Sequence, residues 1–304
     1  MLKKFLIKPW SAIMIAIFCS ILWGSAFPVL KVSYVELQMA PNDVMAKMVF
    51  AGIRFLIAGI IVLVLLAFMD IRKLKITKRQ LLVLTLLGII QTALQYYFFY
   101  NGLAIVSGMQ GAILSSSGIF FTVLLAHFYY NNDRLDRKKW LGIIAGFIGI
   151  VLANWGQSFA ISFQWNGEGY MILAGLTSAI ATIMAKELAT GIHPFAITGW
   201  QLTIGAILLL LVGYPQLQEG SIVFTPLGWG LLLYSALLSA IAFGLWYSLL
   251  KYQAAGKISM YKFIVPVAGV LFSAMFIDGE ALNVMIFGAI VMVASGIIVV
   301  NYRS

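Results

Sequence analysis

Lys262 is the residue whose position most clearly points to chemistry, because its ammonium group falls inside a long apolar run, 257–277. An ammonium within a membrane-spanning helix costs roughly 2.5–3.5 kcal/mol on insertion scales and usually marks a solute pathway. On this interpretation Lys262 binds a carboxylate or another anionic group of a substrate. The alternative is snorkelling, since Lys262 lies only about 8 Å from the start of its run at ~1.5 Å per residue.

A second cation, Arg54, lies deeper in the apolar run 47–68, and that run contains no acidic residue. Arg54 is therefore predicted either to contact substrate or to bond carbonyl groups of the first helix near Pro28. His127, near the inner end of the run 107–129, is the candidate for proton coupling because histidine titrates near neutral pH. A lone histidine at an interface is more often uninvolved, which is the alternative.

Hydroxyl groups and aromatic rings accompany these cations. Ser115 lies on a small, polar helical face, and the run Ser115-Ser116-Ser117 offers three hydroxyl groups at one depth. The alternative is that serines in membrane helices often bond only the carbonyl four residues earlier. Trp23 and Trp246 lie well inside their apolar runs, where rings can stack on a planar or cationic ligand. The aromatic segment 96–100 partly fits an interfacial belt instead.

The composition excludes an ordinary soluble enzyme. Hydrophobic residues make up 62% of the 304 residues and charged residues 10%, whereas soluble domains are about half apolar and about a quarter charged. The formal charge of +10 comes from short loops between apolar runs, so membrane topology explains it better than nucleic-acid binding. The single cysteine, Cys19, excludes an internal disulfide and a Cys-rich zinc site.

The fold predicted by these runs is an all-α integral membrane protein with ten transmembrane helices. A bilayer core needs about 20 apolar residues for each helix. The ten predicted spans are 11–30, 47–68, 80–100, 107–129, 139–156, 169–188, 195–213, 227–250, 257–277 and 283–302.

The chain also repeats itself at an offset of 147 residues, which places Gly149 over Gly296, Asn154 over Asn301 and Tyr100 over Tyr247. Corresponding loops carry opposite charge, and most of the basic residues collect on one side, which predicts cytoplasmic termini in a cell (inner) membrane. The halves, 1–155 and 168–304, are therefore predicted to be inverted five-helix repeats. Such repeats are a transporter architecture with a substrate site near the midplane.

Three motifs resemble the EamA branch of the drug/metabolite transporter superfamily: Leu22-Trp23-Gly24-Ser25-Ala26-Phe27-Pro28, Gly52-Ile53-Arg54-Phe55 and Asp278-Gly279-Glu280. The resemblance implies alternating access and transport of small molecules, commonly export of amino acids or related metabolites. Carried over by position, it implies that Trp23, Phe27, Tyr96, Tyr100, Ser115, Ser116, Trp246 and Lys262 face a central cavity. Lys262 departs from the neutral polar residue usual in similar sequences, and a changed cavity charge would alter the substrate class.

The predicted function is a secondary transporter that exports a small zwitterionic or anionic metabolite. The alternatives are an importer of a similar solute and a lipid-precursor flippase. An intramembrane enzyme would need clustered His, Asp, Glu or Cys side chains, which the sequence does not offer, so neither catalytic residues, a metal nor a cofactor is expected. The expected partners are the solute and the lipid bilayer, without nucleic acid, and no feature supports a homodimer, which stays open.

Overall fold

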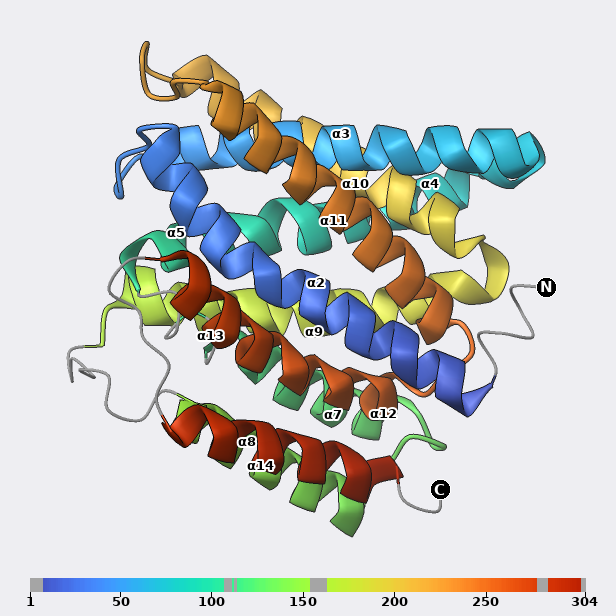
Figure 1. The fold of residues 1–304 in the computed structure, drawn as a ribbon. Coiled ribbons are helices and arrows are strands. Elements are labelled where there is room, and N and C mark those ends of the chain that lie inside the picture. The colour runs from blue at the N-terminus through green and yellow to red at the C-terminus, as the bar shows by residue number, and fades with distance from the viewer. Residues whose placement is uncertain (1–7, 107–110, 112–113, 154–162, 278–283, 302–304) are drawn as a thin grey trace.

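The computed structural model describes residues 8–106, 111, 114–153, 163–277 and 284–301, and every regular element within these ranges is helical (Figure 1). The first half contains α2 (Pro9–Glu36), α3 (Val44–Asp70), α4 (Lys78–Leu87), the π-helix η2 (Gly88–Leu94), α5 (Gln95–Ile105), α7 (Ser117–Tyr129) and α8 (Arg137–Ala153). The second half contains η3 (Trp165–Gly169), α9 (Tyr170–Gly191), α10 (Pro194–Gly213), α11 (Pro226–Leu250), α12 (Ala255–Ser259), the 3-10 turn η5 (Met260–Phe263), α13 (Ile264–Phe276) and α14 (Val284–Asn301). The 3-10 turns η1 (Ile71–Leu74) and η4 (Tyr214–Gln216) follow α3 and α10.

Polar residues just before several helices determine where these begin. The Asp43 side chain accepts a hydrogen bond from the backbone N–H of Ala46 at the start of α3. Thr77 and Gln80 form a reciprocal capping box at the start of α4. Thr225 caps α11, whose first residue is a proline that has no N–H to leave unsatisfied.

Seven helical stretches within the described ranges are long and apolar enough to cross a membrane. They are Pro9–Glu36, Val44–Leu74, Lys78–Ile105, Trp165–Gly191, Pro194–Gln216, Pro226–Leu250 and Ala255–Phe276. The spans predicted at 107–129, 139–156 and 283–302 correspond to α7, α8 and α14, whose described helices are shorter. The count of ten therefore stays a prediction.

The helices pack in a pattern that separates two groups of three. We call α2, α11 and α13 the first bundle, because α2 packs on both of the others. We call α5, α7 and α9 the second bundle, because α9 packs on both α5 and α7. The remaining long helices pack as the pairs α3 with α10 and α8 with α14. Figure 1 shows that α2 and α9 run in opposite directions. It also shows that α2 begins at the end of the molecule where α14 ends.

Two predicted helices are interrupted rather than continuous. The run 257–277 contains the tight turn Met260–Phe263 between α12 and α13. Pro266 explains it, because proline has no N–H and its ring clashes with the carbonyl of the residue four positions earlier, which is Lys262. In the run 107–129, the residue Ser116 forms a turn immediately before α7. Both interruptions place irregular backbone next to a predicted site residue.

Candidate binding cavity

A cavity of about 120 Å³ lies between the two bundles. The described helices α2, α3, α5, α7, α9, α11 and α13 and the irregular segments η2 and η5 all contribute to its wall. The structure brings together at this cavity most of the predicted site residues, namely Trp23, Phe27, Arg54, Tyr96, Ser115, Ser116, Trp246 and Lys262. Arg54 and Lys262 are the charged residues of the lining, which contains no aspartate or glutamate.

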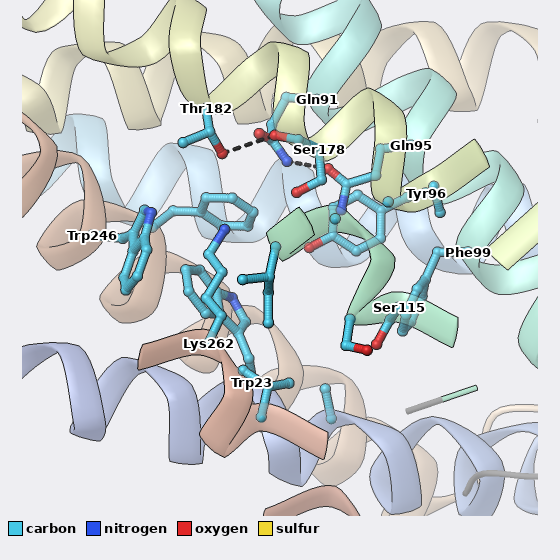
Figure 2. A pocket seen from close by; sticks show the side chains of 18 of the residues that line it. Trp23, Gln91, Gln95, Tyr96, Phe99, Ser115, Ser178, Thr182, Trp246 and Lys262 are labelled. Atoms are coloured by element: carbon cyan, nitrogen blue, oxygen red, sulfur yellow. Dashed lines mark hydrogen bonds between the residues drawn. The ribbon is translucent and has the colours of Figure 1, made fainter. Parts of the chain in front are cut away.

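Lys262 points into the cavity and lies against two indole rings (Figure 2). Its Nζ lies 5.2 Å from the ring centroid of Trp23 and 4.8 Å from that of Trp246. The two rings contact each other edge to face, with centroids 5.2 Å apart. Cation–π attraction therefore holds the ammonium in place. No hydrogen-bond acceptor and no carboxylate in the described part of the chain binds it, so the two indole rings are the protein groups that stabilise its charge.

Arg54 is bound to side chains and carbonyls of two other helices and is only 2% exposed. Its Nε donates to the carbonyl of Ser235 and to Ser239 Oγ, both at 3.1 Å, and its Nη2 donates to Ser239 Oγ at 2.9 Å. Its Nη1 donates to the hydroxyl of Tyr100 at 2.8 Å. The predicted bonds to the first helix near Pro28 were wrong, because the guanidinium turns toward α11 and α5. Arg54 thus ties α3, α5 and α11 together at the edge of the cavity.

Tyr100 and His127 do not border the cavity. Tyr100 accepts the bond from Arg54, and its carbonyl accepts one from the hydroxyl of Tyr34 at 3.3 Å. His127 Nδ1 accepts a hydrogen bond of 3.0 Å from the backbone N–H of Leu135, so it holds the turn after α7. His193 similarly accepts from the backbone of Phe195 at the start of α10, and burial, with two nearby lysines, lowers the pKa of His193. Proton coupling through His127 stays a prediction.

Sequence reasoning missed a polar side of the cavity formed by Gln91, Gln95, Ser178 and Thr182 (Figure 2). Gln91 Nε2 donates to Gln95 Oε1, and Thr182 Oγ1 donates to the carbonyl of Ser178 at 2.8 Å. Gln91 belongs to the π-helix η2, a rare backbone form that often occurs at functional sites. Two glutamines four residues apart in an apolar span were a usable signal, since polar residues in membrane helices usually face the interior.

The cavity belongs to a chain that matches a known family along nearly its whole length. The sequence model of the EamA-like transporter family matches twice, over residues 10–155 and 165–302. The chain belongs to the EamA-like transporter family. This EamA-like transporter is a multi-pass membrane protein, and its cargo is a small molecule.

Several relatives of this EamA-like transporter carry transporter names. It is 26% identical to the uncharacterized transporter YvbV of Bacillus subtilis, over 99% of this chain and 94% of YvbV. It is 27% identical to the uncharacterized transporter YetK of the same organism, over 82% of this chain and 76% of YetK. A solved crystal structure with 16% sequence identity superimposes with a TM-score of 0.78 over 97% of both chains, so the two share a fold.

The family motifs occupy positions that the structure partly explains. Trp23 and Phe27, from the motif in α2, line the cavity, and Arg54, from the motif in α3, lies at its edge. The third motif, Asp278-Gly279-Glu280, lies outside the described residues.

The hydrogen bonds of Arg54 are expected to contribute to the stability of the fold. Replacing Arg54 with Leu should destabilise the protein by about 2–4 kcal/mol, because it removes charge-assisted bonds to Ser239 and Tyr100 and takes away the side-chain partner of the buried Tyr100 hydroxyl. Arg54→Lys should recover only part of this loss, since a single ammonium cannot reach α11 and α5 together. Thermal unfolding of purified protein in detergent would measure both, and equal melting temperatures for parent and Arg54→Leu would contradict the structural role.

Proposed function

We propose that this transporter moves a small metabolite carrying an anionic group, a carboxylate above all, across the cell membrane by alternating access. The observation that carries the proposal is Lys262, whose ammonium lies at the cavity against two rings and has no acidic partner in the described part of the chain. Charges in a low-dielectric interior are costly unless they are paired. A solute that brings a carboxylate next to Lys262 supplies the missing counter-charge, whereas a purely cationic solute adds repulsion.

The remaining lining can hold the rest of a small zwitterionic solute. The Gln91, Gln95 and Ser178 side chains offer donors and acceptors, and the rings of Tyr96 and Phe99 offer faces for a cationic or apolar part. Substrate contact by Trp23, Phe27, Ser115, Ser116 and Trp246 is proposed on the same ground, that they line the cavity.

The cavity volume favours a small metabolite over a lipid precursor. A volume of about 120 Å³ is slightly smaller than an engineered cavity of about 150 Å³ that binds benzene. A solute with a few heavy atoms fits such a space, but the headgroup of a lipid precursor does not. The flippase alternative would need a wider conformation that opens toward lipid.

The symmetry of the cavity supports two inverted five-helix repeats, 1–155 and 168–304. Pairs of lining residues lie 147 positions apart in the sequence: Tyr96 and Phe243, Phe99 and Trp246, Ser115 and Lys262, Ile119 and Pro266. Corresponding helices run in opposite directions in Figure 1, as α2 and α9 or α3 and α10 show. This arrangement supports ten spans that surround a midplane site.

The proposed orientation places both termini in the cytoplasm. The basic residues after α3 and after α7 lie at the same end as the start of α2 (Figure 1), and cytoplasmic loops accumulate lysine and arginine. Export is the proposed direction, on the resemblance to exporters of this superfamily. Import of a similar solute is the alternative, because the architecture of the cavity serves both directions.

A thermal-shift screen of purified protein tests the substrate class. Ligands that bind only the folded state raise the melting temperature by mass action. Small carboxylates and amino acids should stabilise the protein, whereas size-matched amines and amides that lack the anionic group should not. Stabilisation by amines or by lipid-like compounds alone would reject the anionic solute and favour the flippase.

A further inference from the structure

Two lysines outside the cavity bind backbone carbonyls at opposite ends of the molecule. Lys31 is near the last turn of α2, and its Nζ donates to the carbonyl of Val106 at 2.8 Å. Lys186 is near the last turn of α9, and its Nζ donates to the carbonyls of Gln253 at 2.6 Å and Leu250 at 3.0 Å. Since α2 and α9 run in opposite directions (Figure 1), the two contacts lie at opposite ends.

Each contact joins one bundle to the other. Lys31 belongs to α2 in the first bundle, and Val106 directly follows α5 in the second bundle. Lys186 belongs to α9 in the second bundle, and Leu250 is the last residue of α11 in the first bundle. The cavity lies between these bundles, so each lysine ties its two walls together at one end.

The two contacts are the same interaction repeated in the two halves. Val106 and Gln253 are 147 residues apart, which is the offset of the cavity-lining pairs. Lys31 and Lys186 are 155 residues apart, and the same offset relates Trp23 to Ser178 and Phe27 to Thr182, which all line the cavity. The larger offset arises because the loop after α2 is longer than the loop after α9.

We propose that Lys31 and Lys186 are paired latches that determine which end of the cavity opens during transport; this rests on the alternating-access part of the proposed function. Rocking of one bundle against the other lengthens the contacts at one end and preserves those at the other. A lysine bound to carbonyls is suited to this task, because its flexible stem and single charged group can release and re-form charge-assisted bonds. With both contacts formed, the structure corresponds to a closed state.

Among the described residues, a different neighbouring contact supports each latch. At the Lys186 end, Asp133 from the turn after α7 accepts a hydrogen bond of 2.6 Å from the backbone N–H of Gly256 in α12. At the Lys31 end, the hydroxyl of Tyr34 donates to the carbonyl of Tyr100 at 3.3 Å. Loss of Lys31 should therefore open its end more readily than loss of Lys186 opens the other.

A cysteine-accessibility measurement tests the latches without any substrate. Ser178, which lines the cavity, is replaced by Cys in a Cys19→Ala background, and a membrane-impermeant maleimide is applied to right-side-out and inside-out vesicles. Lys31→Met should raise labelling from the Lys31 end about tenfold and lower it from the opposite end. Lys186→Met should produce the reverse pattern with a smaller rise. Lys31→Arg and Lys186→Arg keep the donor and should stay within about twofold of the parent.

Lys75→Met, which removes an exposed positive charge at the same end as Lys186, is the matched control and should leave both labelling rates unchanged. Equal changes from both sides, or changes in the same direction for both lysines, would overturn the latch proposal. If a methionine variant does not elute as a single species in gel filtration, the corresponding glutamine variant, Lys31→Gln or Lys186→Gln, is measured instead, because glutamine keeps a neutral donor. Because the assay needs no solute, a failed carboxylate screen leaves it intact, and a failed latch leaves the solute proposal intact.

Discussion

Replacing Lys262 with Met should weaken binding of small carboxylates by at least about 30-fold. Truncating one partner of a buried charge pair typically costs 2–5 kcal/mol, and each ~1.4 kcal/mol corresponds to tenfold in affinity. The expected loss is large because Lys262 has no acidic partner in the described part of the chain, so the carboxylate of the solute is its counter-charge. Binding to purified protein by calorimetry, and counterflow in proteoliposomes, measure the change.

Two variants separate the role of this charge from a general effect on the fold. Lys262→Arg keeps a cation beside Trp23 and Trp246 and should retain part of the affinity. Lys251→Met removes a positive charge just after α11, away from the cavity lining, and should bind as the parent does. If Lys262→Met binds carboxylates with unchanged affinity, the anchor lies elsewhere, and Arg54 becomes the first residue to examine.

Replacing Gly24 with Ala should destabilise the protein by about 1–3 kcal/mol through overpacking. A Cβ atom at Gly24 would lie 2.6 Å from the Cβ of Ala268 and 2.8 Å from the carbonyl oxygen of Val265. Both neighbours belong to α13, and a backbone carbonyl cannot move aside without shifting the helix. Because Val265 lines the cavity and Lys262 lies in the turn Met260–Phe263 that leads into α13, the variant should also bind solute more weakly.

Gly230→Ala is the matched control, because nothing lies within 4 Å of a Cβ atom at Gly230. Alanine is favoured over glycine inside a helix by up to about 1 kcal/mol, so this variant should melt at the parent temperature or slightly above it. Thermal unfolding monitored by intrinsic fluorescence compares the two. A Gly24→Ala protein as stable as Gly230→Ala would show that α2 and α13 can separate without cost.

Local signals in the sequence predicted the helical membrane class, the unusual lysine and the family. The apolar runs predicted the helical membrane class, because the length and composition of a span are properties of consecutive residues. Lys262 stood out for the same reason, since a charge in an apolar run is costly wherever the helix packs. The family followed from short motifs in α2 and α3, and the family match along the chain confirmed it.

Contacts between distant residues could not be read in the same way. Arg54 was singled out in the sequence, but the carbonyl that it binds belongs to Ser235, 181 positions away. Nothing in the sequence near Arg54 favours this carbonyl over one of the first helix. The polar side formed by Gln91 and Gln95 depends on a π-helix, whose backbone hydrogen bonds do not follow from composition. The resemblance placed Tyr100 at the cavity, but its hydroxyl binds Arg54 and it does not line the cavity.

The sequence by itself determined that this chain forms apolar helices, that most of its basic residues fall in loops, and that an unusual lysine lies within a span, because each of these depends on neighbouring residues. Only the tertiary structure decided which groups surround that lysine and which lysines join the two bundles. Side-chain direction and helix packing are set by contacts between segments far apart in the chain, so the indole rings beside Lys262 and the carbonyls bound by Lys31 and Lys186 become visible only once the helices are assembled.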